Sequence, residues 1–234
     1  MNQRMRKYRI IAVVPAYNEA DRIEAVIHKA RNYVDEIIVV NDGSSDDTSA
    51  IARVCGVEVI DLLINRGAGY ATRCGCDHAL LRNAEIIITL DADGQHCAAD
   101  IPDLVDTLIE SRLDIVFGYR IQGKGSPIEK KLGNKMLSFM VRCLYNMKLK
   151  DVLTGFHAFP ASSYPLIRWK ANRYVFILEY IKNVYKNRLK FAEVKIKTIY
   201  FEKQHGMKIH DGIKSMFYLI WWRCELLFFG RGKK

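Results

Sequence analysis

The chain has 234 residues, of which half are hydrophobic and about a quarter are charged. This composition excludes a disordered polymer and suits one α/β domain with its own core. The net charge of +10 is unevenly divided: residues 1–119 carry seven more acidic than basic residues, and residues 120–234 carry seventeen more basic than acidic ones. A basic half of this kind attracts phosphorylated substrates, anionic membranes or nucleic acid, although a merely solvated basic surface is the simpler alternative.

Strand and helix patterns alternate along the first 120 residues. Apolar runs predict strands at 9–14, 36–40, 57–60, 85–90 and 114–119, and the stretches between them predict helices around 23–30, 46–54, 69–81 and 101–111. This alternation predicts an α/β fold with a mostly parallel, Rossmann-like sheet and helices on both faces. The six cysteines lack the spacing of paired zinc sites or of a disulfide scaffold, so free thiols are expected.

The second half is less regular. It predicts a helix at 126–144, a polar turn and short strand at 151–160, a helix at 174–187, a strand at 191–200 and an amphipathic helix at 211–229. The last helix is rich in aromatic residues and is followed by basic ones, as in helices that lie at a membrane interface, although a core or dimer helix has the same apolar pattern. It is too short, and too interrupted by Arg223 and Glu225, to be a clean transmembrane span. We therefore expect a catalytic unit at 1–210 and a membrane-associating or oligomerisation helix at 211–234.

Polar clusters follow the first four predicted strands. They read PAYNE at 15–19, NDGSSDDT at 41–48, NRGAG at 65–69 and DADGQH at 91–96. Ligands of parallel α/β sheets sit at the carboxyl ends of the strands, so four such loops predict one shared binding site. The phosphate-binding fingerprints GxxxxGK[ST] and GxGxxG are both missing from the sequence.

The pair Asp91 and Asp93 carries the clearest chemistry. Two carboxylates directly after a buried strand are costly unless they are paired or hold a metal, and Mg²⁺ or Mn²⁺ prefers such oxygen ligands together with substrate phosphates. The alternative is a helix-capping pair ahead of the helix at 101–111. Asp42 stands at another strand end, where a carboxylate can bind a base or ribose, or can simply make an Asp-Gly turn. Arg66 and its neighbouring glycines suit a phosphate group.

These motifs in this order resemble glycosyltransferase family 2, which has the GT-A fold. DADGQH followed by D-x-x-TGF at 151–156 is similar to the polyprenyl-phosphate mannose and glucose synthases. The resemblance spans about residues 8–210. It implies transfer of a hexose, mannose or glucose, from a GDP- or UDP-sugar to a polyprenyl (dolichyl) phosphate by a metal-dependent, inverting single displacement. It also implies a peripheral enzyme on the cytoplasmic face of a membrane.

The same resemblance assigns roles to individual residues. Asp91, Asp93 and Gln95 would hold the metal, Asp42 the base, and Arg120 an acceptor phosphate. Apart from the resemblance, we expect the acceptor phosphate to enter towards Arg120 and the basic residues near Lys131. The remaining donor-binding positions are Pro15, Ala16, Tyr17, Glu19, Gly67, Gly69, Lys203 and Lys208. Lys203 stands where the family usually has Arg, which replaces a bidentate fork by a point charge.

An acceptor phosphate is already an anion at neutral pH and needs little deprotonation, whereas a sugar hydroxyl would need a general base. Asp151 is the candidate base, or else it shapes the acceptor site. Transfer to a glycan hydroxyl of a lipid-linked oligosaccharide is therefore the second hypothesis, and a non-catalytic nucleotide-sugar-binding module is the third. Nucleic-acid binding rests on charge alone, because the basic half lacks a recognisable motif, and we do not expect it.

Overall fold

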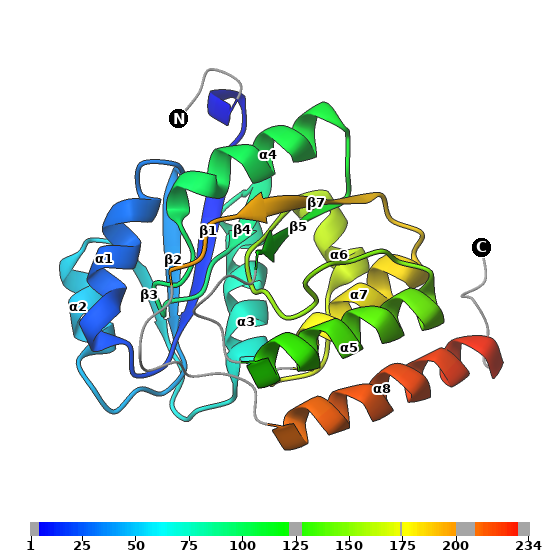
Figure 1. Cartoon of the computed structure of the whole chain (residues 1–234). Helices are drawn as coiled ribbons and strands as arrows, with labels where there is room; N and C mark the ends of the chain where they lie inside the picture. Colours follow the sequence, from blue (N-terminus) through cyan, green and yellow to red (C-terminus); the bar gives the residue numbers. More distant parts are fainter. Residues whose placement is uncertain (1–4, 122–127, 174, 200–208, 229–234) are drawn as a thin grey trace.

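The computed structural model describes residues 5–121, 128–173, 175–199 and 209–228 (Figure 1). Its centre is a seven-stranded sheet in the order β3-β2-β1-β4-β6-β5-β7. The strands are β1 (Ile10–Ala16), β2 (Glu36–Asn41), β3 (Glu58–Asp61), β4 (Ile86–Thr89), β5 (Ile115–Arg120), β6 (His157–Pro160) and β7 (Phe191–Ile196). All neighbours pair in parallel except β6, which runs antiparallel to both β4 and β5.

Helices cover both faces of the sheet. They are α1 (Ala20–Ala30), α2 (Thr48–Val54), α3 (Ala68–Leu81), α4 (Ile101–Glu110), α5 (Ile128–Tyr145), α6 (Tyr164–Ile167), α7 (Phe176–Lys186) and α8 (Ile209–Phe228). Alternate residues of the strands point to opposite faces, so Ile11 and Val13 pack with α3 and α5 to α8, whereas Ala12 and Val14 pack with α1, α2 and α4. The central strands are apolar throughout because both of their faces are buried.

The predicted fold is confirmed. Each expected strand and helix is present, with bounds that differ by a few residues at most ends; β7, for example, ends at Ile196 rather than at residue 200. The short helix α6 and the antiparallel direction of β6 were not predicted. The residues that form β6 are too few to reveal their partner strands from sequence alone.

Helix α8 packs along α5 and α7 (Figure 1). Leu219 and Leu226 enter the core, and the Tyr145 hydroxyl donates a hydrogen bond to the Leu219 carbonyl at 2.9 Å. The other side of α8 exposes large apolar residues such as Phe217 and Trp221, so the expected amphipathic character is not confirmed. None of the helices in the described ranges has both the length and the hydropathy needed to cross a bilayer.

Candidate active site

The four polar loops meet at one edge of the sheet. They follow β1, β2, β3 and β4, which are neighbouring parallel strands and therefore end on the same side. The four loops thus lie at one edge of the sheet, as the sequence predicts.

The first loop is held by the second. Asn18 adopts a positive φ of 54°, its N–H donates to the Ser44 hydroxyl at 2.9 Å, and its side-chain oxygen accepts the Ser45 N–H at 2.9 Å. The Glu19 N–H donates to the Thr48 hydroxyl at 2.9 Å, and the Glu19 carboxylate is buried in an ion pair with a neighbouring arginine of α1. Interlocked in this way, the two loops can present a rigid surface to a ligand.

The predicted donor residues of this first loop differ in accessibility. Tyr17 is exposed and can cover a ligand, Pro15 is half-buried, and Ala16 and Glu19 are buried. The accessible residues, Tyr17 above all, are therefore the ones that can contact a donor directly, while Glu19 shapes the loop.

Asp42 joins the second loop to the third. Its carboxylate is buried and accepts the Arg66 N–H at 2.7 Å and the Gly67 N–H at 2.8 Å. At Gly43, with φ of 69°, a Cβ would lie 2.7 Å from the Asn65 nitrogen, so this position requires glycine. Each carboxylate oxygen of Asp42 retains a lone pair, and the predicted contact with a base stays a prediction.

The two glycines of the third loop lie beneath a later segment of the chain. Gly67 has φ of 96°, and a Cβ there would lie 2.5 Å from the Asn172 carbonyl oxygen. A Cβ on Gly69 would lie 2.6 Å from the Ala171 carbonyl oxygen, and the Gly69 carbonyl accepts the Trp169 indole N–H at 2.7 Å. Both glycines are therefore needed so that residues 169–172 can cover the start of α3. Arg66 is exposed, and its guanidinium lies over the Tyr70 ring at 5.3 Å from the ring centroid.

Asp91 and Asp93 lie just beyond β4 and are both half-buried; we call this place the aspartate recess. Burial raises the pKa of both carboxyl groups, and the charge of Asp91 raises the pKa of Asp93 further. The Asp93 oxygens accept the Gln95 backbone N–H at 3.0 Å and the Gln95 side-chain amide at 2.7 Å. Two carboxylates that destabilise each other in this way fit a divalent cation, which would relieve their repulsion. Gln95, expected as a further ligand, contacts Asp93 in this arrangement.

Two residues behind Asp91 were not assigned a role from the sequence. His96 is buried, stacks on Phe156 at 5.1 Å between ring centroids, and accepts the Asp91 N–H on Nδ1 at 3.4 Å. Its Nε2 faces the Asp91 carboxylate at 3.7 Å, and burial lowers its pKa to about 4, so the ring is neutral at pH 7. On the other side, a Cβ on Gly155 would lie only 2.5 Å from Asp91 Oδ1. Both residues belong to quoted motifs, but their contacts with Asp91 arise from the fold.

Arg120 and Asp151 form a two-pronged ion pair next to this recess. The Arg120 Nε and one terminal nitrogen donate to the Asp151 oxygens at 2.6 and 3.1 Å. Asp151 also accepts the Leu153 N–H at 3.1 Å, and its side chain is fully buried. Asp151 therefore fixes the orientation of Arg120, which remains partly exposed at the end of β5. Lys131 lies in the first turn of α5 and is half-buried.

The segment after β7 is hydrogen-bonded to the stretch that follows Asp91 and Asp93. The Lys197 N–H donates to Asp100 Oδ2 at 2.6 Å, and the Ile199 N–H donates to the Gln95 carbonyl at 2.9 Å. The chain therefore runs alongside residues 95–100 up to residue 199. Lys203 and Lys208, the predicted diphosphate contacts, lie outside the described residues.

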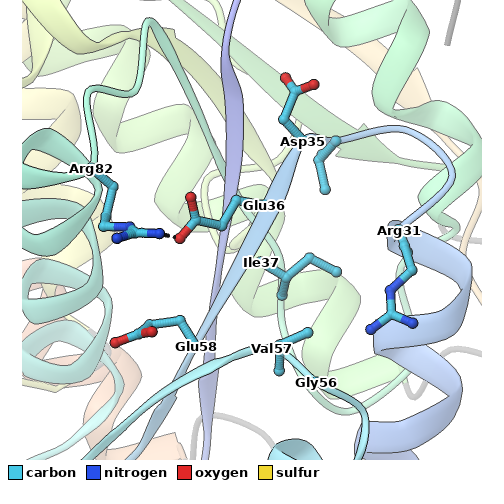
Figure 2. Close-up of a pocket in the computed structure, with 9 residues that line it drawn as sticks. Arg31, Asp35, Glu36, Ile37, Gly56, Val57, Glu58 and Arg82 are labelled. Atoms are coloured by element: carbon cyan, nitrogen blue, oxygen red, sulfur yellow. Dashed lines mark hydrogen bonds and ion pairs between the residues drawn. The ribbon is translucent and has the colours of Figure 1, made fainter.

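The pocket drawn in Figure 2, with a volume of about 430 Å³, is separate from this site. It lies at the opposite edge of the sheet, where β2 and β3 begin, and is lined by charged residues that include Arg31, Glu36, Glu58 and Arg82. Arg82 donates to Glu36 at 2.9 Å, so part of its charge is already neutralised internally (Figure 2). Asp91 and Asp93 lie instead at the edge of the sheet where the four polar loops meet.

Solved structures share this architecture. The crystal structure of glucosyl-3-phosphoglycerate synthase from Mycobacterium tuberculosis in complex with UDP matches with a TM-score of 0.74 and 20% sequence identity, over 93% of this chain and 80% of that chain. The fold is that of a GT-A glycosyltransferase. The sequence model of glycosyl transferase family 2 matches residues 11–176, and the chain belongs to this family of enzymes.

Relatives of similar length are known. An uncharacterised protein of Methanocaldococcus jannaschii is 37% identical, over 92% of each chain. The UDP-N-acetylglucosamine–dolichyl-phosphate N-acetylglucosaminyltransferase of Methanococcus voltae is 33% identical, over 90% of this chain and 94% of its own length. The polyprenol monophosphomannose synthase of Mycolicibacterium smegmatis is 26% identical, over 64% of this chain and 61% of its own length. The names of the last two relatives describe enzymes that act on dolichyl phosphate or form polyprenol monophosphomannose.

Proposed function

We propose that this enzyme transfers a hexose from a GDP- or UDP-sugar to a polyprenyl phosphate. Mannose and glucose are the first candidates, and the Methanococcus voltae relative adds N-acetylglucosamine to the donors to be tested. The observation that carries the proposal is the position of Arg120, which the buried Asp151 holds beside the aspartate recess. A partly exposed guanidinium fixed there suits an acceptor phosphate next to the sugar donor.

The reaction would be a single displacement. A phosphate oxygen of the acceptor attacks the anomeric carbon of the sugar, the bond to the nucleoside diphosphate breaks, and the configuration inverts. Asp91 and Asp93 would hold Mg²⁺ or Mn²⁺, which when bound supplies charge neutralisation for the leaving diphosphate. Arg120 would bind and orient the attacking phosphate, and the loop carrying Asp42 would position the nucleoside. Lys203 and Lys208 remain proposed diphosphate contacts.

The ion pair between Arg120 and Asp151 also bears on the choice between a polyprenyl phosphate acceptor and a glycan hydroxyl acceptor. A sugar hydroxyl acceptor would need a base to take its proton, and Asp151 was the candidate. Its carboxylate is fully buried and bonded to Arg120 and to the Leu153 N–H, so it is poorly placed to reach a hydroxyl. This favours an acceptor that is already an anion over the glycan hydroxyl of a lipid-linked oligosaccharide.

The direct test is a transfer assay. GDP-mannose, UDP-glucose and UDP-N-acetylglucosamine would each be incubated with a short polyprenyl phosphate and Mg²⁺ or Mn²⁺, and in parallel with a lipid-linked sugar. Transfer to the polyprenyl phosphate is the expected result. Transfer only to the lipid-linked sugar would establish the second hypothesis instead, and tight nucleotide-sugar binding without turnover would support the non-catalytic one.

We further propose that the enzyme approaches its lipid acceptor as a peripheral protein on the cytoplasmic face of a membrane. Large apolar side chains are exposed on two helices that pack together, among them Leu132 and Phe139 on α5 and Phe217 and Trp221 on α8. Helix α5 also reaches the acceptor side, because the Asn134 side chain accepts the Val152 N–H beside Asp151. Exposed apolar side chains on α8 and on a helix that also reaches the proposed phosphate site suit a lipid substrate.

Sedimentation with anionic vesicles tests this surface. The double variant Phe217→Ser/Trp221→Ser should bind vesicles several-fold more weakly than the unmodified chain. Leu81→Ser is the matched control, because Leu81 is equally exposed but ends α3 elsewhere on the molecule. Equal binding by all three proteins would assign the exposed apolar residues of α8 to contact with another protein copy.

A further inference from the structure

We propose that Glu24, His28 and Cys55 form a binding site for Zn²⁺, separate from the aspartate recess. Glu24 and His28 lie one turn apart on α1, and Cys55 directly follows α2. The three candidate ligand atoms all lie within 4.8 Å of one another, and the His28 Nε2 is 3.7 Å from a Glu24 carboxylate oxygen. Because α1 and α2 pack against each other, the site would add a metal-mediated link between two helices that are already in contact.

The distances suit a tetrahedral ion. Zinc binds histidine nitrogen and carboxylate oxygen at about 2.0–2.2 Å and cysteine sulfur at about 2.3 Å, which places neighbouring ligand atoms roughly 3.3–3.7 Å apart. The His28–Glu24 separation of 3.7 Å lies slightly above the spacing of about 3.3–3.6 Å that a nitrogen and an oxygen ligand would have. Glu24 and His28 are exposed, so side-chain rotation can bring their ligand atoms closer to Cys55 without moving the core.

The ligand types select a different metal from the catalytic one. A thiolate, an imidazole and one carboxylate favour zinc, whereas Mg²⁺ and Mn²⁺ prefer the all-oxygen set of Asp91 and Asp93. Three protein ligands would leave one coordination position for water. Each candidate ligand is at least partly accessible to solvent, so an ion could reach the site in the folded enzyme.

The charges around Cys55 determine whether its thiol must lose a proton when it binds a metal ion. Burial and the negative charge of Glu24 raise the pKa of the Cys55 thiol, and the nearby Arg31 opposes this shift. The thiol is therefore protonated at neutral pH, and binding of Zn²⁺ would release one proton to solvent as the thiolate forms the bond. The ion would face two negative ligands, Glu24 and the thiolate, against the single positive charge of Arg31.

A bound ion would link the two helices that follow the proposed donor-binding loops. Helix α1 follows the loop at 15–19 and α2 follows the loop at 41–48, and the site lies towards the far ends of both helices. A bound ion would thus stabilise the half of the sheet that carries these loops without contacting a substrate. Loss of the ion should leave the metal-dependent transfer chemistry intact.

Cobalt substitution tests the site directly. The full chain, in excess Mg²⁺ to occupy the aspartate recess, would be titrated with Co²⁺, whose absorption reports both thiolate ligation and tetrahedral geometry. One equivalent should produce the thiolate-to-cobalt band, and Zn²⁺ should displace it. Cys55→Ser should abolish the band, and His28→Ala should weaken Co²⁺ binding at least tenfold.

Two comparisons make the result decisive. Cys224→Ser removes an exposed cysteine on α8 and should leave the band unchanged. Zn²⁺ should raise the thermal unfolding midpoint of the unmodified chain but not of Cys55→Ser, while both proteins keep equal sugar-transfer rates with Mg²⁺. Absence of the thiolate band in the unmodified chain, or its persistence in Cys55→Ser, would overturn the zinc site. Neither outcome would affect the proposed transfer reaction.

Discussion

Gly155→Ala should damage catalysis far more than folding. The new Cβ would stand 2.5 Å from one Asp91 carboxylate oxygen and 2.8 Å from the other, whereas ordinary contact begins at 3.4 Å. The Asp91 carboxylate must therefore move by about 1 Å, and a misplacement of about 1 Å in a reacting constellation can lower the rate by about 10²-fold. We expect a loss of that order in transfer rate, together with weaker Mn²⁺ binding.

Folding should be much less affected, because the obstructed atoms are the end of a side chain that is partly open to solvent. The matched control is Gly133→Ala in α5, where a Cβ meets nothing within 4 Å. That variant should be more stable by about 0.5–1 kcal/mol, since glycine weakens a helix interior, and should retain its activity with a short acceptor.

The assay combines initial transfer rates with calorimetric Mn²⁺ titration and thermal unfolding of all three proteins. If folded Gly155→Ala transferred sugar at the unmodified rate and bound Mn²⁺ equally well, the position of the Asp91 carboxylate would be irrelevant to metal binding. The assignment of the recess as the catalytic centre would then fail.

Two further variants test other parts of the site, and a third tests a buried histidine of β6. Asp93→Ala should lower transfer by at least about 10²-fold while its unfolding midpoint stays close to that of the unmodified chain, and excess chelator should abolish transfer by the unmodified enzyme. Asp42→Ala leaves the Arg66 and Gly67 N–H groups without their acceptor, so donor affinity should fall by about 1.5–3 kcal/mol with a smaller change in kcat, measured by nucleotide-sugar titration. Burial lowers the pKa of His157 to about 3, so this ring stays neutral in the fold but takes up a proton below about pH 6.5 when unfolded. Stability should therefore fall as pH falls, and His157→Phe should lose about 2 kcal/mol less than the unmodified chain between pH 7.5 and pH 5 in denaturant unfolding.

The parallel strands β1 to β4 could be predicted from the sequence because the patterns that indicate them lie within each strand and in the loop after it. A buried parallel strand is a continuous apolar run, and its carboxyl end carries the polar residues of a site, as at Asp42 and Asp91. The direction of β6 has no such signal. His157 pairs with Thr89, almost seventy residues earlier, and this pairing is decided by long-range packing rather than by the four residues of the strand.

The contacts made by the loop side chains could not be predicted from the sequence, because many of their hydrogen-bond partners are backbone groups. Asp42 accepts two N–H groups from the next loop, a contact that no pattern of side chains reveals. Gly67 and Gly69 were expected to contact the donor, and that contact stays a prediction; the sequence did not show that a Cβ on either glycine would meet the backbone of Asn172 or Ala171. Lys203 and Lys208 lie outside the described residues, so their proposed contacts stay predictions.

The antiparallel strand explains how one sheet edge can serve two substrates. Parallel strands present their carboxyl ends at this edge, whereas β6 presents its amino end there, so residues 151–156 arrive immediately before the strand begins. This brings Asp151 beside Arg120 after β5, and Gly155 beside Asp91 after β4. On the proposed function, β3-β2-β1-β4 support the donor and β6-β5-β7 support the acceptor, with β6 aligning one against the other. The charge of the chain divides at nearly the same place, acidic before residue 120 and basic after it, as expected where one half holds a cation and the other binds an anionic lipid phosphate.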